Sequence, residues 1–123
     1  MKVRECYERA LGFVPEEASD AALENYMTGW TNQLLADTFE VENAIRRAAG
    51  EAELLLPPVV SSPEDEIPYH DVLTAKAFPY GMARWIFRDE EDISGSREYY
   101  SLYVAAIREA VPYVVGAVRD IYG

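Results

Sequence analysis

The sequence predicts an all-α fold, namely a single-domain bundle of about four to five helices with a long proline-containing loop and a C-terminal extension. Half of its 123 residues are apolar, which is enough to bury a core within one domain. Apolar residues recur at spacings of three and four in several segments, as on one face of a helix. Prolines and glycines separate these segments. We therefore treat residues 1–123 as one helical domain without internal repeats.

Two amphipathic helices are expected in the first half of the chain. The first covers residues 2–11, where the apolar side chains form one stripe and Gly12 ends the helix. Cys6 lies on that stripe, so we expect a core residue there rather than a nucleophile. The second helix starts at Ser19 as its N-cap, keeps one face apolar for about six turns and ends at Gly50.

A long loop is predicted over residues 51–68, because its four prolines are incompatible with a continuous helix. This loop is too apolar for a free linker, so we interpret it as an extended arm laid over the protein or as a surface offered to a partner. A short strand over residues 58–61 is a further alternative.

The most continuous apolar character lies in residues 67–87, which we interpret as a buried central helix. Pro79 should kink or break this helix near residues 75–78, because proline lacks the N–H group and crowds the preceding turn. A final helix is expected to start near Ser94 or Ser96. Its expected buried face consists of six residues: Tyr99, Leu102, Tyr103, Ala106, Ile107 and Ala110. Residues 112–123 either extend this helix after Pro112 or leave the domain as an arm.

The composition excludes several function classes. The net charge of −11 argues against sequence-specific nucleic-acid binding, because such binding depends on Lys and Arg. No apolar run approaches the length of a membrane span, and the N-terminal residues lack a signal peptide, so we expect a cytoplasmic protein without membrane contact. A single cysteine excludes an intrachain disulfide.

Candidate chemistry is sparse, and we expect no catalytic residue, no cofactor and no metal site. Residues 89–92 form the densest acidic group, but they lack the ligand pattern of an EF-hand, so a solvated turn is favoured. Glu5 and Glu8 match only half of the metal-binding motif of all-helical pyrophosphatases. His70 beside Asp71 is a weak acid–base pair, and a hydrogen bond at the start of a helix is favoured for His70.

Interface candidates are the apolar residues of the loop, one partly exposed tyrosine and the apolar residues of the C-terminal segment. The set comprises Leu55, Leu56, Val59, Val60, Tyr100, Tyr113, Val114, Val118, Ile121 and Tyr122.

The order of these segments resembles small helical proteins encoded in the structural modules of tailed phages and prophages, in particular the head–tail connector or adaptor class. The resemblance spans nearly the whole chain. Its motifs are the long helix ending at residues 42–47, the proline loop at 62–69, Phe78–Ala83, the acidic turn at 89–92, residues 99–103 and the closing residues 120–123.

The resemblance implies a non-enzymatic virion assembly protein that bridges the portal and tail proteins or assembles with itself in a ring. Its location would then be the virion, and an acidic lumen would let DNA slide past without binding. The alternative is a non-viral acidic adaptor of the bacterial cytoplasm that uses the same apolar loop for a protein partner. A small acid–base enzyme using His70 and Asp71 is a third hypothesis.

Overall fold

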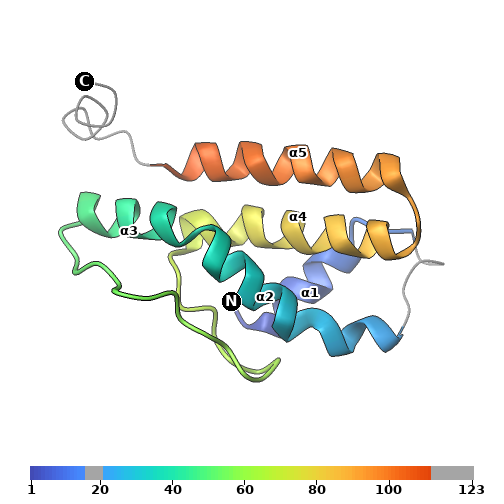
Figure 1. Ribbon diagram of the computed structural model, residues 1–123, viewed down its shortest axis with the longest axis horizontal. Helices are drawn as coiled ribbons and strands as arrows, with labels where there is room; N and C mark the ends of the chain where they lie inside the picture. The colour runs from blue at the N-terminus through green and yellow to red at the C-terminus, as the bar shows by residue number, and fades with distance from the viewer. Residues whose placement is uncertain (16–20, 112–123) are drawn as a thin grey trace.

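The computed structural model describes residues 1–15 and 21–111, and these form an all-α single-domain bundle (Figure 1). The α-helices are α1 (Val3–Leu11), α2 (Met27–Asp37), α3 (Phe39–Ala48), α4 (Asp71–Asp89) and α5 (Ile93–Ala110), and a 3-10 helix, η2 (Ala21–Tyr26), precedes α2. The described residues contain no β-strand beyond one isolated bridge between Lys2 and Glu66, so the alternative of a strand over residues 58–61 is wrong.

Helix α4 is the centre of the bundle. It lies antiparallel beside α5 (Figure 1) and also packs against α1 and α2. Leu73, Phe78, Met82 and Ile86 are at most 1% exposed, which agrees with a buried central helix. Within the described part of the chain, no helix has both the length and the apolar composition that a membrane crossing requires.

Of the kink or break predicted near residues 75–78, the break is wrong, because α4 runs through Pro79 without interruption. Proline deprives the Ala75 carbonyl of its usual N–H partner. Ala75 is exposed, so water can reach that carbonyl, while Pro79 itself is buried in the core. Burial of the apolar face thus outweighs the loss of one backbone hydrogen bond.

The single long helix predicted before Gly50 is also wrong, because Thr38 separates α2 from α3. The Thr38 hydroxyl donates to the Leu34 carbonyl at 2.7 Å, a back-bond that bends helices. The end of the segment is as predicted: Gly50 adopts a φ of 75°, and Glu51 N–H donates to the Arg46 carbonyl at 2.8 Å. The proposed N-cap Ser19 lies outside the described residues.

Helix α5 begins at Ile93, which confirms the predicted start near Ser94. Its N-cap is Asp92, whose carboxylate accepts from Gly95 N–H at 2.9 Å. On the predicted buried face, Tyr103 is 3% exposed but Leu102 is 37% exposed and faces solvent. Ala106 and Ala110 are buried, and Tyr99 and Ile107 are partly buried against the core. Residues 112–123 lie outside the described part of the chain.

Two glycines allow α4 and α5 to approach closely. A Cβ atom on Gly81 of α4 would lie 3.2 Å from Tyr103 Cδ1 of α5 and 2.6 Å from Leu34 Cδ2 of α2. One on Gly95 of α5 would lie 2.5 Å from Phe87 Cδ1 of α4. The second clash is the more severe, because the Phe87 ring is buried and presents two further carbons at 2.9 Å.

We expect Gly95→Ala to lower the free energy of unfolding by about 1–3 kcal/mol, since the Phe87 ring must move within a packed core. Gly29→Ala is the matched control, because a Cβ there meets nothing within 4 Å and α2 gains up to about 1 kcal/mol of helix propensity. Urea unfolding of both variants measures the difference. Equal effects of the two substitutions would contradict the close approach.

Candidate functional site

The most exposed large apolar side chains of the described chain lie together in the loop between α3 and α4. Leu55 is 93% exposed, Leu56 is 78% exposed and Val59 is 76% exposed. Two prolines, Pro57 and Pro58, separate the leucines from the valine and fix the backbone φ angles there. We call residues 55–59 the apolar strap.

Two asparagine side chains hold the ends of the apolar strap. The Asn43 amide donates to the Leu54 carbonyl at 3.0 Å and accepts from Leu54 N–H at 2.8 Å. Asn32 pairs with Val60 in the same way, at 3.0 Å and 2.8 Å. Each amide therefore satisfies both backbone groups of one loop residue, as a neighbouring strand would. Because Asn32 belongs to α2 and Asn43 to α3, both helices position the strap.

Val60 was expected at the interface with the other strap residues, and that expectation is wrong. Its side chain is 4% exposed and belongs to the hydrophobic core. The pairing with Asn32 fixes the backbone of Val60 against α2, and successive side chains of an extended segment point in opposite directions. Val59 is therefore presented to solvent while Val60 anchors the strap.

The remaining interface candidates lie elsewhere. Tyr100 is 47% exposed on α5, as expected for a tyrosine with one face in solvent, and it lines a separate cavity with Arg84. The other five, Tyr113, Val114, Val118, Ile121 and Tyr122, lie outside the described residues.

A buried carboxylate fixes both ends of the loop to α3. Glu42 is completely buried and accepts from Arg46 Nε at 2.7 Å and from the backbone N–H of His70 at 2.9 Å. Its other contact is with the His70 ring, whose Nδ1 lies 2.8 Å from Glu42 Oε2. His70 Nε2 lies 2.8 Å from Glu51 Oε2. The His70 side chain thus links the start of α4 to Glu51, which follows α3.

The two carboxylates determine the protonation of His70. Ionised carboxylates only accept hydrogen bonds, so both ring nitrogens must donate and the ring must carry its positive charge. The hydrogen bond to Glu42 raises the pKa of His70 most, and the bond to Glu51 raises it further. Protonated His70 therefore forms ion pairs with both Glu42 and Glu51.

The acid–base pair of His70 and Asp71 is not formed, because both ring nitrogens of His70 face glutamates instead. The favoured helix-start hydrogen bond of the His70 side chain is also wrong, since that side chain makes no cap contact with α4. Among the described residues no group of three or more His, Cys, Asp or Glu side chains is arranged to hold a metal ion. The glutamates lie on opposite sides of the His70 ring.

Asn32 and Asn43 are not among the residues predicted from sequence, although the sequence carries a signal for them. Asparagine is unfavourable inside a helix because its amide competes for backbone groups. The two are 11 residues apart, about three helical turns, so they would share one face of the single long helix that the sequence predicts. That pattern indicates a pair of amides directed at another backbone segment.

Comparisons with known proteins gave no relative of this chain. A scan against protein-family models found no match, and searches of curated proteins and of solved structures found no similar protein. Function must therefore be inferred from the residues of this chain.

We expect Asn32→Ala and Asn43→Ala each to lower the free energy of unfolding by about 1–3 kcal/mol, because each removes two hydrogen bonds to backbone groups of the loop. Amide hydrogen exchange should accelerate at Val60 in the first variant and at Leu54 in the second. Gln33→Ala on the exposed face of α2 is the control and should change neither amide. Unchanged exchange in the asparagine variants would show that the strap is held by other contacts.

We also expect the melting temperature to fall as the pH rises above 6.5, the ordinary pKa of His70. The folded pKa is raised, so the stabilisation is fully present below the unfolded value and is lost as the pH rises through the folded pKa. Circular dichroism melts from about pH 6 to about pH 9 measure this slope. His70→Gln stays neutral throughout and should flatten it, so parallel curves for the two proteins would contradict the ion pairs of His70.

Proposed function

We propose that this chain is a non-enzymatic assembly subunit of a tailed phage or prophage virion, of the head–tail connector or adaptor class, and that it docks on portal or tail proteins through the apolar strap. The observation that carries the proposal is that three neighbouring apolar side chains are presented to solvent on a backbone held at both ends. Location in the virion is part of the same proposal.

The physical argument concerns the entropy of binding. Three side chains that are at least 76% exposed leave apolar area that a partner can remove from water. A mobile loop would lose conformational entropy on docking, whereas a strap held by four amide hydrogen bonds has already lost much of it. The strap therefore has the properties of a preorganised docking element.

The charge of the chain supports a structural role near DNA. With 22 acidic and 11 basic residues, the protein repels phosphates on average and would let a genome pass without holding it. The second candidate function, a non-viral regulatory adaptor, would use the same strap for a single protein target.

The test has two parts. The gene of a connector should lie among capsid and tail genes, and the portal and tail proteins encoded there are the partners to purify. We expect the chain to bind one of them, and we expect a variant with Leu55→Ser, Leu56→Ser and Val59→Ser to bind about tenfold more weakly or worse, because the buried apolar contacts are removed.

Val72→Ser is the control, since Val72 is 60% exposed on α4 and lies outside the strap. Isothermal titration calorimetry gives the affinities, and thermal melts check that the strap variant still folds. Gene neighbours without virion components, together with strap-dependent binding to a regulatory protein, would favour the adaptor. Equal affinities of wild type and strap variant would remove the strap from either function.

A further inference from the structure

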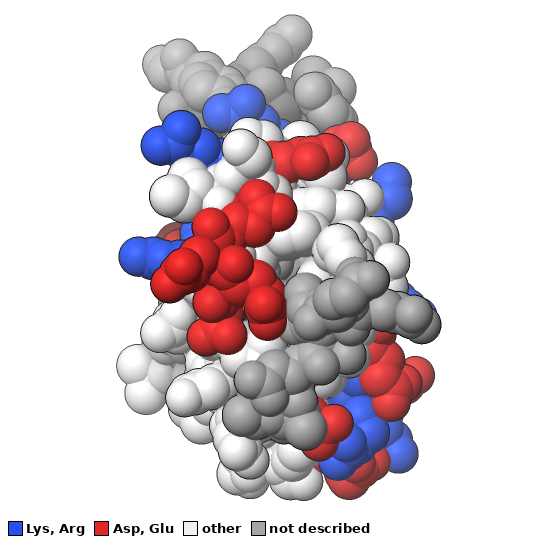
Figure 2. Space-filling view, turned by 90° about the vertical axis from the view of Figure 1, so that its right-hand side faces the viewer, with Lys and Arg blue, Asp and Glu red and all other residues white. Residues whose placement is uncertain are grey.

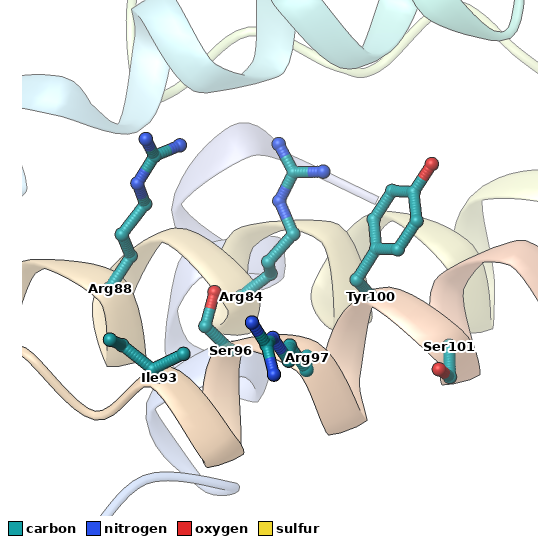
Figure 3. A pocket seen from close by; sticks show the side chains of 7 residues that line it. All are labelled: Arg84, Arg88, Ile93, Ser96, Arg97, Tyr100 and Ser101. Atoms are coloured by element: carbon teal, nitrogen blue, oxygen red, sulfur yellow. The ribbon is translucent and has the colours of Figure 1, made fainter.

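An arginine-lined cavity lies between α4 and α5, away from the features used so far. Its volume is about 620 Å³, and its lining includes Arg84 and Arg88 from α4 and Arg97 and Tyr100 from α5. In Figure 3 the side chains of Arg84, Arg88 and Tyr100 extend to the same side of the two helices. We call this feature the arginine pocket.

Arg84 is held in place by aromatic rings. Its guanidinium lies 4.7 Å from the centroid of the Trp85 ring and 5.0 Å from that of Tyr100. Trp85 in turn stacks on Trp30 of α2 at 5.9 Å between ring centroids. Cation–π contacts leave the N–H groups at the edge of a guanidinium available to a carboxylate or phosphate.

The pocket arginines form no ion pair with the residues that the structure describes. No ion pair within 4 Å involves Arg84, Arg88 or Arg97 in the described part of the chain, although Lys2, Arg4, Arg46, Arg47 and Lys76 all form one. In a chain with twice as many acidic as basic residues, three arginines around one cavity without an ion pair to residues 1–15 or 21–111 are an available anion site.

The surroundings favour a protein carboxylate over a nucleic acid. A duplex carries a long series of phosphates and would meet the repulsion of a chain with net charge −11, whereas a short acidic segment adds few charges. Arginine, tyrosine and tryptophan side chains beside a 65%-exposed Ile93 are also the residue types that dominate protein interfaces.

The chain itself supplies such a segment. The acidic turn, residues 89–92, connects α4 to α5, and all four of its residues are exposed. Figure 2 views the molecule from the end on which this turn lies and shows acidic side chains gathered there. The turn makes no ion pair with the arginine pocket of its own chain within the described residues.

We propose that the arginine pocket binds the acidic turn of a second copy of this chain. The inference rests on the proposed function, because it assigns the contact between neighbouring subunits of the assembly. The two patches are contiguous, because Arg88 and Ile93 of the pocket flank residues 89–92. Two copies can therefore pair so that the acidic turn of each meets the arginine pocket of the other. The apolar strap then stays available for portal or tail proteins.

The test uses two charge-reversal variants of the full chain. Arg88→Glu with Arg97→Glu makes the pocket acidic and leaves Arg84 on its aromatic rings, while Asp89→Lys with Glu90→Lys makes the turn basic. Sedimentation velocity at about 50 mM and about 500 mM salt measures self-association. We expect wild type to self-associate, more strongly at low salt, and each variant alone to do so at least about tenfold more weakly.

An equimolar mixture of the two variants should associate again, because the acidic turn of one meets the unchanged pocket of the other and the basic turn meets the reversed pocket. Arg9→Glu with Arg108→Glu is the matched control, since it changes the charge equally with two exposed arginines outside the pocket, and it should associate as wild type does. Thermal melts of all variants check folding.

Three results would overturn the inference: a wild-type monomer at about 1 mM and low salt, variants that associate as wild type does, or a mixture that stays dissociated although both variants fold. Binding of a labelled DNA duplex that is lost only in the pocket variant would also overturn it by assigning the arginines to phosphate. Binding to portal or tail proteins through the strap does not use the pocket. If that binding persists while self-association is absent, only the proposed contact between two copies has failed.

Discussion

The buried carboxylate of Glu42 is the constraint on which the arrangement of the loop depends. A charge fully removed from water is tolerated only when its oxygens are hydrogen-bonded, and here the donors are Arg46, the His70 backbone and the His70 ring. Because these donors lie on α3 and at the start of α4, satisfying one carboxylate fixes where the loop leaves and where it returns. The bond from His70 to Glu51 then closes the loop.

The side-chain amides of Asn43 and Asn32 determine which residues of that closed loop are exposed. Asn43 and Asn32 hold Leu54 and Val60, so the residues between them cannot fold back onto the core. The exposed leucines and valine are thus a consequence of polar contacts on either side rather than of weak packing. An apolar surface maintained in this way is expected for a subunit that must dock on another protein without rearranging.

The molecule therefore presents two surfaces of different character. The apolar strap removes hydrocarbon from water when a partner covers it, whereas the arginine pocket and the acidic turn pair by charge and respond to salt. Such a division suits an assembly subunit, because contacts with like copies and contacts with other proteins can form independently. It also separates the proposed function from the further inference, since each depends on different residues.

The sequence alone determined the all-α class, the presence of a buried central helix, predicted over residues 67–87 and found over Asp71–Asp89, the end of α3 at Gly50 and the proline loop with Leu55, Leu56 and Val59. These features follow from apolar periodicity and from the backbone limits of proline and glycine, which act within a few residues.

Only the tertiary structure decided the break at Thr38, the continuity of α4 through Pro79, the burial of Val60 and the position of Arg88 and Arg97 around one cavity. The continuity of α4 and the burial of Val60 depend on groups far apart in the chain: a proline is tolerated where its helix is central to the core, and a valine is buried where a distant asparagine holds its backbone. Periodicity cannot report such pairings, because they become favourable only when the helices pack together.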